Sequence, residues 1–169
     1  TSPSYGPIVR LERFGIYNNL IYIYKFRTMY PYSEFLQSYL YEQKGLNIDG
    51  NKIFEDYRIT TWGKILRKLW LDELPQLYNW IRGDISLIGV RALSKDKLDL
   101  YPGELKELRS EFKPGLIPPF YADLPNSFEG LLESERTYLL SKKEKSLTTD
   151  VKYFFNAFNN IVFKGARSQ

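Results

Sequence analysis

Cysteine and histidine are both missing from this chain of 169 residues. Without them the protein has no thiolate nucleophile, no disulfide, no imidazole base and no zinc site of the ordinary type. Any catalysis must therefore use carboxylate, ammonium, guanidinium or hydroxyl side chains.

Long hydrophobic runs are also missing, because the longest uninterrupted apolar stretch covers only residues 20–24. A helix needs about 20 apolar residues to span a bilayer, so we expect no membrane-spanning segment in this sequence. The sequence begins at Thr1 without a basic and apolar leader, and we expect it to be a piece of a longer polypeptide.

Two nucleotide-binding fingerprints are absent as well. The sequence contains neither G-x-G-x-x-G nor G-x-x-x-x-G-K-[ST], so it gives no support to a Rossmann dinucleotide site or a P-loop ATPase. No serine stands in a nucleophile elbow. A carboxylate is the strongest remaining nucleophile, because carboxylates form covalent intermediates with phosphoryl and glycosyl groups.

What the sequence does contain is typical of a folded domain, with 43% hydrophobic and 26% charged residues. The length predicts a single domain over residues 1–169. The 24 basic and 20 acidic residues give a net charge of +4. Basic residues and 17% aromatics leave a single-stranded nucleic-acid binder as an alternative, but the small charge and the lack of an RNA-binding motif argue against nucleic acid as a partner.

Hydrophobic periodicity predicts a β-hairpin at the start of the chain. Its strands are expected at residues 8–14 and 20–26, on either side of a turn at Asn18-Asn19. Helical spacing then marks residues 32–40, and Gly45 is expected to end that amphipathic helix. Residues 45–57 show little periodicity and predict a loop.

Two helices are predicted in the centre of the chain. Thr60 or Thr61 caps the first, which runs to about Trp70, and Asp72 opens the second, which ends at Gly83. The apolar positions of the first helix form one face, which consists of Trp62, Ile65, Leu66 and Leu69. Those of the second helix are predicted to face inward: Leu74, Leu77, Tyr78 and Ile81.

The rest of the chain predicts a buried strand and three more helices. The strand is expected at residues 85–90, charged helices at 98–112 and 128–143, and an irregular loop at 113–125 because of its four prolines. Asp150 is expected to cap the last helix and Gly165 to close it. The apolar stripe of that helix consists of Val151, Phe154, Phe155, Phe158, Ile161 and Val162. The fold class is therefore α+β, a mostly helical single domain with an N-terminal β-hairpin.

Two adjacent carboxylates, Asp72 and Glu73, are the first candidates for chemistry. At a helix start, exposed amides favour an ionised carboxylate by about 0.3 to 1 kcal/mol. Adjacent acids can also share Mg²⁺, which is commonly held by one or two carboxylates together with substrate phosphates. The alternative is a plain helix cap with a favourable acid in the first turn.

Several cations surround this pair in the sequence. Arg fits phosphate oxygens with a rigid fork of donors, and Lys acts as a mobile point charge. Arg67 is the most suggestive, because it lies just before the acids. For each cation taken alone, a solvated surface position is the alternative. The candidates are Lys25, Arg27, Arg58, Lys64, Arg67, Lys68 and Arg91.

Three segments strongly resemble the bacterial sugar transferase family, the monotopic polyprenyl-phosphate phosphoglycosyl transferases. They are YKFRTM at residues 24–29, RITTWGKILRKLWLDELPQLYNWIRGDISLIGVR at 58–91, and KPG at 113–115. The resemblance runs from about Gly6-Pro7 to Gly165, and the LDELPQL core followed by GD-S-x-x-G-x-R is its most specific part.

The resemblance implies an enzyme and assigns roles. Asp72 is the implied nucleophile, which takes a sugar-1-phosphate from a UDP-sugar, releases UMP and passes the phosphosugar to a polyprenyl phosphate. Asp72 and Glu73 are the implied Mg²⁺ ligands. Arg67 and Arg91 match family arginines near the phosphates, and Lys25 and Arg27 match the family's KFR element.

The family also has an N-terminal hydrophobic helix that dips into one leaflet of the membrane. Because these residues lack it, the resemblance implies the catalytic part of a longer protein, or a trimmed relative, at the cytoplasmic face of the bacterial inner membrane. The pI near 9.1 is compatible with docking on an anionic bilayer.

Three positions depart from the family pattern. Val90 and Ala92 stand where the family has prolines beside Arg91, and Leu69-Trp70 replaces the usual Thr-Ser. The family's P-G-[IL]-T-G stretch becomes residues 114–119, with two further prolines. These departures motivate an alternative function: a degenerate homologue that serves as a membrane-surface binding or regulatory module.

Overall fold

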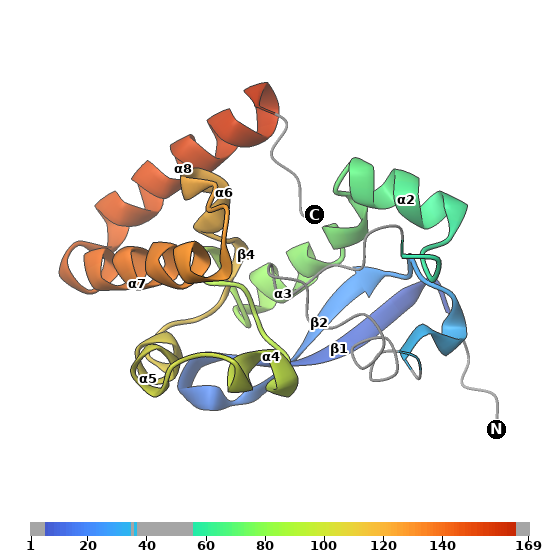
Figure 1. Ribbon diagram of the computed structural model, residues 1–169, viewed down its shortest axis with the longest axis horizontal. Coiled ribbons are helices and arrows are strands. Elements are labelled where there is room, and N and C mark those ends of the chain that lie inside the picture. Colours follow the sequence, from blue (N-terminus) through green and yellow to red (C-terminus); the bar gives the residue numbers. More distant parts are fainter. Residues whose placement is uncertain (1–5, 35, 37–55, 165–169) are drawn as a thin grey trace.

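The computed structural model describes residues 6–34, 36 and 56–164, and it confirms the α+β, mostly helical fold. Figure 1 shows the β-hairpin at one end of the molecule and helices α6, α7 and α8 at the other, with α3 between them. The N-terminal hairpin is confirmed: β1 (Ile8–Phe14) pairs antiparallel with β2 (Leu20–Phe26).

A compact turn joins the two strands of the hairpin. Gly15 leads into the 3-10 turn η1 (Ile16–Asn18), in which Tyr17 and Asn18 adopt positive φ angles. Short connections of this kind fix the strand register, which places Val9 opposite Lys25 and Leu11 opposite Ile23. Directly opposite residues share a face of the sheet, so Lys25 lies on the same face as the buried Ile23.

Helix α2 (Thr61–Lys68) begins where the sequence predicts. The Thr60 hydroxyl accepts a hydrogen bond from the Gly63 N–H (2.9 Å), which is the contact of a helix cap. The expected second helix is divided into the 3-10 turn η3 (Leu71–Glu73) and α3 (Gln76–Arg82), which Gly83 ends in the left-handed conformation. Asp72 therefore lies inside the turn and does not cap α3, so both the predicted helix start and the plain-cap alternative are wrong.

The predicted buried strand is β3 (Ser86–Ile88), and it has a partner that the sequence did not indicate. Strand β4 (Gly115–Ile117) pairs with it in parallel, after a crossover through α4 (Lys95–Asp99) and α5 (Gly103–Ser110). The two backbones approach so closely that a Cβ on Gly115 would lie 2.0 Å from the Gly89 nitrogen.

The expectation of an irregular loop at residues 113–125 is wrong, since this segment contains β4 and the short helix α6 (Phe120–Asp123). Pro114 and Pro118 flank β4 and therefore remove no donor from its ladder. Pro119 precedes α6, where a helix needs no N–H donor.

Helices α7 (Phe128–Glu144) and α8 (Ser146–Phe163) close the core against β3. The predicted start of the last helix at Asp150 is wrong, because Asp150 lies in the second turn of α8. Its carboxylate accepts hydrogen bonds from the Tyr138 hydroxyl (2.7 Å) and from Lys142 Nζ (2.9 Å). The core consists of Ile88, Val90, Leu93, Tyr101, Leu105, Tyr138, Leu139 and Tyr153.

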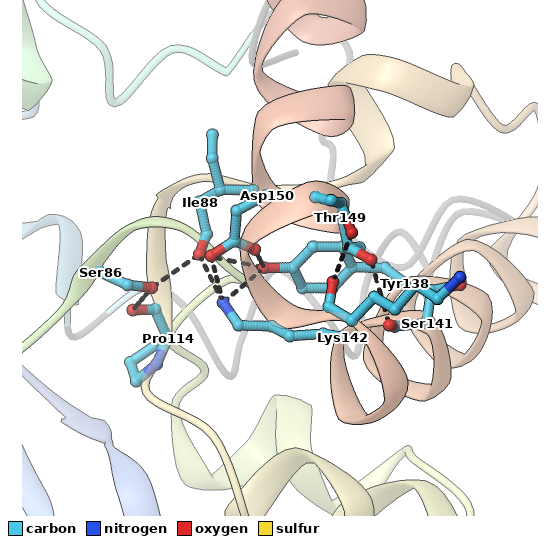
Figure 2. Close-up of polar contacts among 10 residues, drawn as sticks. Ser86, Ile88, Pro114, Tyr138, Ser141, Lys142, Thr149 and Asp150 are labelled. Carbon is cyan, nitrogen blue, oxygen red and sulfur yellow. Dashed lines mark hydrogen bonds and ion pairs between the residues drawn. The ribbon is translucent and has the colours of Figure 1, made fainter.

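The polar cluster of Tyr138, Lys142 and Asp150 also anchors the end of β3, as Figure 2 shows. Lys142 Nζ donates to the Ile88 carbonyl oxygen (3.2 Å) and to the Tyr138 hydroxyl (2.8 Å), and the Tyr138 hydroxyl lies 3.1 Å from the same Ile88 oxygen. The chain segment that leaves β3 toward Arg91 is thus held by two side chains of α7.

The predicted inward direction of the apolar positions in the second central helix is wrong, since all four are exposed: Leu74, Leu77, Tyr78 and Ile81. Helix α3 instead buries Gln76 and Asn79. Most of the apolar positions that the sequence groups in α2 and α8 are exposed as well, although Tyr153 of α8 belongs to the core and Phe154 packs against it. The exposed positions are Trp62, Ile65 and Leu69 in α2, and Val151, Phe155, Phe158 and Val162 in α8.

The amphipathic helix expected at residues 32–40 lies mostly outside the described residues, which contain only the 3-10 turn η2 (Pro31–Glu34) at its start. Most of the loop expected at residues 45–57 and the predicted stop at Gly165 also lie outside them.

Candidate active site

The two carboxylates are presented by a strained turn between α2 and α3. Trp70 adopts a left-handed conformation with φ 62°, which turns the chain so that Asp72 and Glu73 follow in η3. Such a conformation costs on the order of 1–3 kcal/mol in a residue with a side chain, and it is typical of functional sites. The Trp70 ring packs against Tyr121 (4.8 Å between centroids), while its indole N–H is buried without a hydrogen-bond partner among the described residues.

Glu73 forms the electrostatic centre of the site. Lys25 Nζ donates to Glu73 Oε1 at 2.5 Å, and Arg91 Nη2 lies 4.0 Å from the same oxygen. Burial opposes ionisation of Glu73, but Lys25 and Arg91 outweigh it and hold the pKa of this carboxyl below its usual range. Gln76 adds a side-chain hydrogen bond. Glu73 is therefore an anion at neutral pH that is already paired with protein cations.

Asp72 is in a different state, although it is the next residue. Only 8% of its surface is exposed. Burial, with the repulsion of Glu73, raises the pKa of Asp72, and the attraction of Lys25 and Arg67 only partly opposes this rise. The Asp72 carboxylate is thus poorly solvated, and a poorly solvated anion gains most from a cation or from bond formation.

Arg67 reaches the site from α2 through a specific contact with the segment after the hairpin. Its Nε donates to the Thr28 hydroxyl at 2.9 Å. Helix α2 can lie this close because a Cβ on Gly63 would be 2.0 Å from the Thr28 carbonyl oxygen. That oxygen also accepts hydrogen bonds from the Thr60 N–H (3.0 Å) and hydroxyl (3.2 Å).

Arg91 extends from a segment that is fixed on both sides. The Val90 carbonyl accepts a hydrogen bond from the Gly115 N–H (2.9 Å), and the Arg91 carbonyl accepts one from Arg109 Nη2 (2.6 Å). Arg109 is itself held by a buried ion pair with Glu135. The Arg91 side chain remains 41% exposed, so its backbone is fixed while its guanidinium reaches solvent.

The family model described as bacterial sugar transferase matches residues 2–164, which is nearly the whole chain. The chain belongs to the bacterial sugar transferase family.

Three relatives illustrate the range of the family. The chain is 32% identical to the galactosyl transferase CpsE of Streptococcus agalactiae, over 87% of this chain and 33% of the relative. It is 31% identical to the UDP-galactose-lipid carrier transferase of Erwinia amylovora, over 93% and 33%. It is 40% identical to the undecaprenyl-phosphate galactose phosphotransferase of Salmonella typhimurium, over 53% and 20%. The chain thus spans only 20–33% of the length of these relatives.

The structure brings together most of the residues that the family resemblance assigns. Lys25 and Arg91 contact Glu73, and Arg67 interacts electrostatically with Asp72. Arg27 makes a different contact, because its Nε donates to the Gly6 carbonyl oxygen at 3.0 Å. Its assignment to substrate binding stays a prediction.

The positions that depart from the family pattern have local explanations. Val90 is buried in the core, where its side chain packs, and Arg91 is held by hydrogen bonds to its neighbours' backbone and its own. Flanking prolines are therefore not needed to fix this segment. Arg58, another cation singled out in the sequence, is buried and paired with Asp56 at 2.6 Å.

Sequence reasoning missed three polar residues that build the site. Gln76 contacts Glu73, and Asn79 joins α3 to β2 by accepting from the Tyr24 N–H (3.0 Å) and donating to the Tyr22 carbonyl (2.7 Å). Arg109 positions the Arg91 backbone. For Gln76 and Asn79, the signal in the sequence was their spacing: they are polar residues three positions apart in a predicted helix that is otherwise mostly apolar.

The donor set fits Mg²⁺ in its chemistry. Asp72 and Glu73 supply hard carboxylate oxygens, which Mg²⁺ prefers. Glu73 Oε1 is engaged by Lys25. Among the described residues, no group of three or more acidic side chains gathers to form a complete protein cage. Two carboxylates plus substrate phosphates are thus the set that this site can provide.

No helix within residues 6–34 and 56–164 has both the length and the apolar character needed to cross a bilayer.

Proposed function

We propose that this protein transfers a sugar-1-phosphate from a UDP-sugar to a polyprenyl phosphate such as undecaprenyl phosphate, through a covalent phosphosugar intermediate on Asp72. Such a reaction would initiate exopolysaccharide, capsule or O-antigen assembly. The observation that carries the proposal is the poorly solvated Asp72 carboxylate, adjacent to a Glu73 that is paired with Lys25 and Arg91. The names of the lipid-carrier and undecaprenyl-phosphate relatives support the acceptor.

In the first step, an Asp72 carboxylate oxygen attacks the phosphorus that carries the sugar. A new P–O bond forms to Asp72, and the bond between this phosphorus and the bridging oxygen breaks, so UMP leaves with that oxygen. The reacting groups are all anionic, so their repulsion must be neutralised. Arg67, which interacts with Asp72, and Arg91, which lies 4.0 Å from Glu73, provide guanidinium groups for this purpose.

In the second step, a phosphate oxygen of the lipid acceptor attacks the same phosphorus. The P–O bond to Asp72 breaks, the carboxylate is regenerated, and a diphosphate links the sugar to the lipid. Both steps transfer a phosphoryl group between oxygens, and neither needs a proton from a histidine. The site therefore handles two bulky substrates in turn with one nucleophile.

Asp72 and Glu73 are the residues that would hold Mg²⁺. The ion supplies Lewis-acid neutralisation of the phosphate oxygens when it is bound. The pairing of Lys25 with Glu73 orients the second carboxylate of the pair.

Trapping the intermediate tests the proposal. The protein is incubated with a panel of UDP-sugars and Mg²⁺, and mass spectrometry is used to detect a phosphosugar adduct on Asp72. Asp72→Asn should abolish the adduct and lower UMP release by more than about a thousandfold, as expected when a nucleophile is removed. Asp96→Asn, which removes an exposed carboxylate in α4, is the matched control and should keep both.

The alternative, a binding or regulatory module without turnover, is favoured by the 8% exposure of Asp72, which limits access to its carboxylate, and by Ala92 beside Arg91. It predicts neither adduct nor UMP release with any donor, while binding of a polyprenyl phosphate persists. An adduct on Asp72 eliminates it.

We also propose that the protein works at the cytoplasmic face of the bacterial inner membrane, as the lipid acceptor requires. Three helices, α2, α3 and α8, leave many apolar side chains exposed, although α8 also places Tyr153 in the core. Ile81 is 79% exposed and Trp62 is 76% exposed. Exposed apolar area on this scale is typical of a surface that meets lipid or a partner.

A further inference from the structure

The backbone of Arg91 is tied to a buried ion pair between α5 and α7. Arg109 of α5 pairs with Glu135 of α7 through Nη1. Arg109 is only 7% exposed and Glu135 only 1%. The other terminal nitrogen of the same guanidinium, Nη2, donates to the Arg91 carbonyl oxygen at 2.6 Å. One planar group therefore connects α7 with the segment that carries Arg91.

Tyr101 completes the surroundings of this guanidinium. The Arg109 guanidinium carbon lies 4.8 Å from the centre of the Tyr101 ring, and the Tyr101 hydroxyl lies 3.5 Å from Glu135 Oε1. An arginine has a planar fork whose nitrogens bind separate acceptors while its face stacks on an aromatic ring. Lysine has the same charge but neither the fork nor the face. This set of contacts is therefore specific to arginine at position 109.

The stability of the fold does not by itself require this ion pair. Replacing a buried pair with apolar side chains of similar volume is often neutral or stabilising. The positions one turn away are already apolar, since Leu105 of α5 and Leu139 of α7 belong to the core. Apolar side chains at positions 109 and 135 would leave the Arg91 carbonyl without the Arg109 donor. The pair thus adds to the core a fixed hydrogen-bond donor for the Arg91 backbone.

The Arg91 carbonyl is one of several points at which this segment is held. The neighbouring carbonyls of Val90 and Leu93 accept hydrogen bonds from backbone N–H groups, at 2.9 and 3.1 Å. At Arg91 the donor is the Arg109 side chain, and the Arg91 guanidinium extends from this point to within 4.0 Å of Glu73 Oε1. A shift of the Arg91 backbone would move the guanidinium relative to the acids. Donors that are fixed in advance stabilise a charge without such rearrangement.

We infer that Arg109 and Glu135 are positioning residues for phosphate binding, and that they act through Arg91. The inference rests on the proposed function for the role of Arg91 as a phosphate ligand. Arg109 and Glu135 are buried, so they exert their effect on the ligand indirectly. Arg109 fixes the Arg91 backbone, and Glu135 orients and neutralises Arg109. A pair buried between two helices thus determines how tightly the site binds phosphate.

A double-mutant cycle separates an effect through Arg91 from a general effect on the fold. Isothermal titration calorimetry gives the Kd of UMP, in the presence of Mg²⁺, for the wild type, Arg91→Gln, Arg109→Lys and the double variant. Arg91→Gln should raise the Kd about tenfold, the scale of a lost charged hydrogen bond. Arg109→Lys retains the charge beside Glu135 but not the fork. It should raise the Kd at least about threefold when Arg91 is present and less than about 1.5-fold in the Arg91→Gln background, because both changes then remove one interaction.

A second variant and a control keep the test independent of folding. Arg109→Met combined with Glu135→Leu removes both charges together, so it should melt no lower than Arg109→Lys and show the same dependence on Arg91. Circular dichroism measures the melting temperatures. The matched control is Lys143→Gln, which breaks an exposed ion pair between α7 and Glu111 at the end of α5 (2.7 Å). It should change the Kd less than about twofold, because exposed pairs contribute little.

Equal increases of the Kd in both backgrounds would mean a general effect on the fold and would overturn the inference. So would an unchanged Kd in Arg109→Lys, UMP binding that is absent or independent of Arg91, or a failure of both position-109 variants to fold. Trapping keeps this result apart from the proposed function. An Asp72 adduct without coupling between residues 91 and 109 refutes the positioning role alone. Coupling without any adduct refutes the transferase alone.

Discussion

At the scale of single residues, Asp72 and Glu73 show how neighbouring carboxylates acquire different properties. Glu73 is held ionised by Lys25 and Arg91 in spite of its burial, whereas burial and the charge of Glu73 raise the pKa of Asp72. One carboxylate is therefore paired with cations of the protein, and the other is poorly solvated. This division suits a nucleophile with a fixed anionic neighbour.

The raised pKa of Asp72 predicts that its ionised carboxylate destabilises the fold. Above its ordinary value of 3.8, the unfolded carboxyl has lost its proton while the folded one still holds it, so stability falls as pH rises through the folded pKa. Asp72→Asn should therefore melt at a higher temperature than the wild type at pH 7, and the difference should shrink toward pH 3. Differential scanning calorimetry across this range measures it, with Asp96→Asn as the control for losing a surface charge. A difference that does not vary with pH contradicts the prediction.

At the scale of elements, α2 and α3 position the site through unusual contacts. Helix α2 lies against the segment after β2 through Gly63, and α3 is tied to β2 through the Asn79 amide. Both contacts use backbone groups, those of Thr28 for α2 and those of β2 for α3. The residues that these helices bury are consequently small or polar, and Arg67 and Gln76 interact with the acids.

Gly63→Ala tests the close contact of α2. The new Cβ would overlap the Thr28 carbonyl oxygen, so α2 has to move and Arg67 with it. We expect a loss of about 1–3 kcal/mol in the free energy of unfolding, as for other overpacked sites, together with a raised KM for the donor. Urea denaturation and initial rates measure the two effects.

Gly103→Ala is the matched control, because a Cβ at the start of α5 meets no atom within 4 Å. Alanine is the better helix former there by about 1 kcal/mol, so this variant should be as stable as the wild type or slightly more stable. If Gly63→Ala behaves in the same way, α2 does not depend on the close approach.

At the scale of the whole molecule, the exposed apolar residues of α2 and α8 lie on helices at one side of the fold. Figure 1 shows α2 and α8 along its upper side, and α4 and α5 along its lower side. The most exposed phenylalanines of α8, Phe155 and Phe163, are 63% and 77% exposed. A bilayer in contact with α8 would bury such side chains.

Phe155→Glu should therefore weaken association with vesicles of anionic and zwitterionic phospholipids. Burial of a Phe side chain contributes about 1.5–3 kcal/mol, so we expect at least about a tenfold loss in partitioning, measured by cosedimentation. Leu20→Glu is the control, since Leu20 is similarly exposed but lies at the end of the hairpin. Equal losses in both variants would contradict a lipid-facing side on α8.

The sequence by itself determined the local elements and the chemistry available. Strand alternation gave both hairpin strands, Thr60 gave the start of α2, and Gly83 gave the end of α3. The lack of Cys and His, with the LDELPQL motif, directed attention to Asp72 and Glu73. Caps, periodicity and motifs depend on residues close together in the chain, so they can be interpreted without a fold.

Only the tertiary structure decided which way the helices face and which cations meet the acids. The pairing of β3 with β4 needs partners 29 positions apart, Ser86 and Gly115, and no local pattern encodes it. Periodicity shows that α3 and α8 have an apolar side, but the medium that this side meets depends on what else packs nearby. Lys25 and Arg91 meet Glu73 in the same way, because the fold brings β2 and the segment after β3 to the turn that carries this carboxylate.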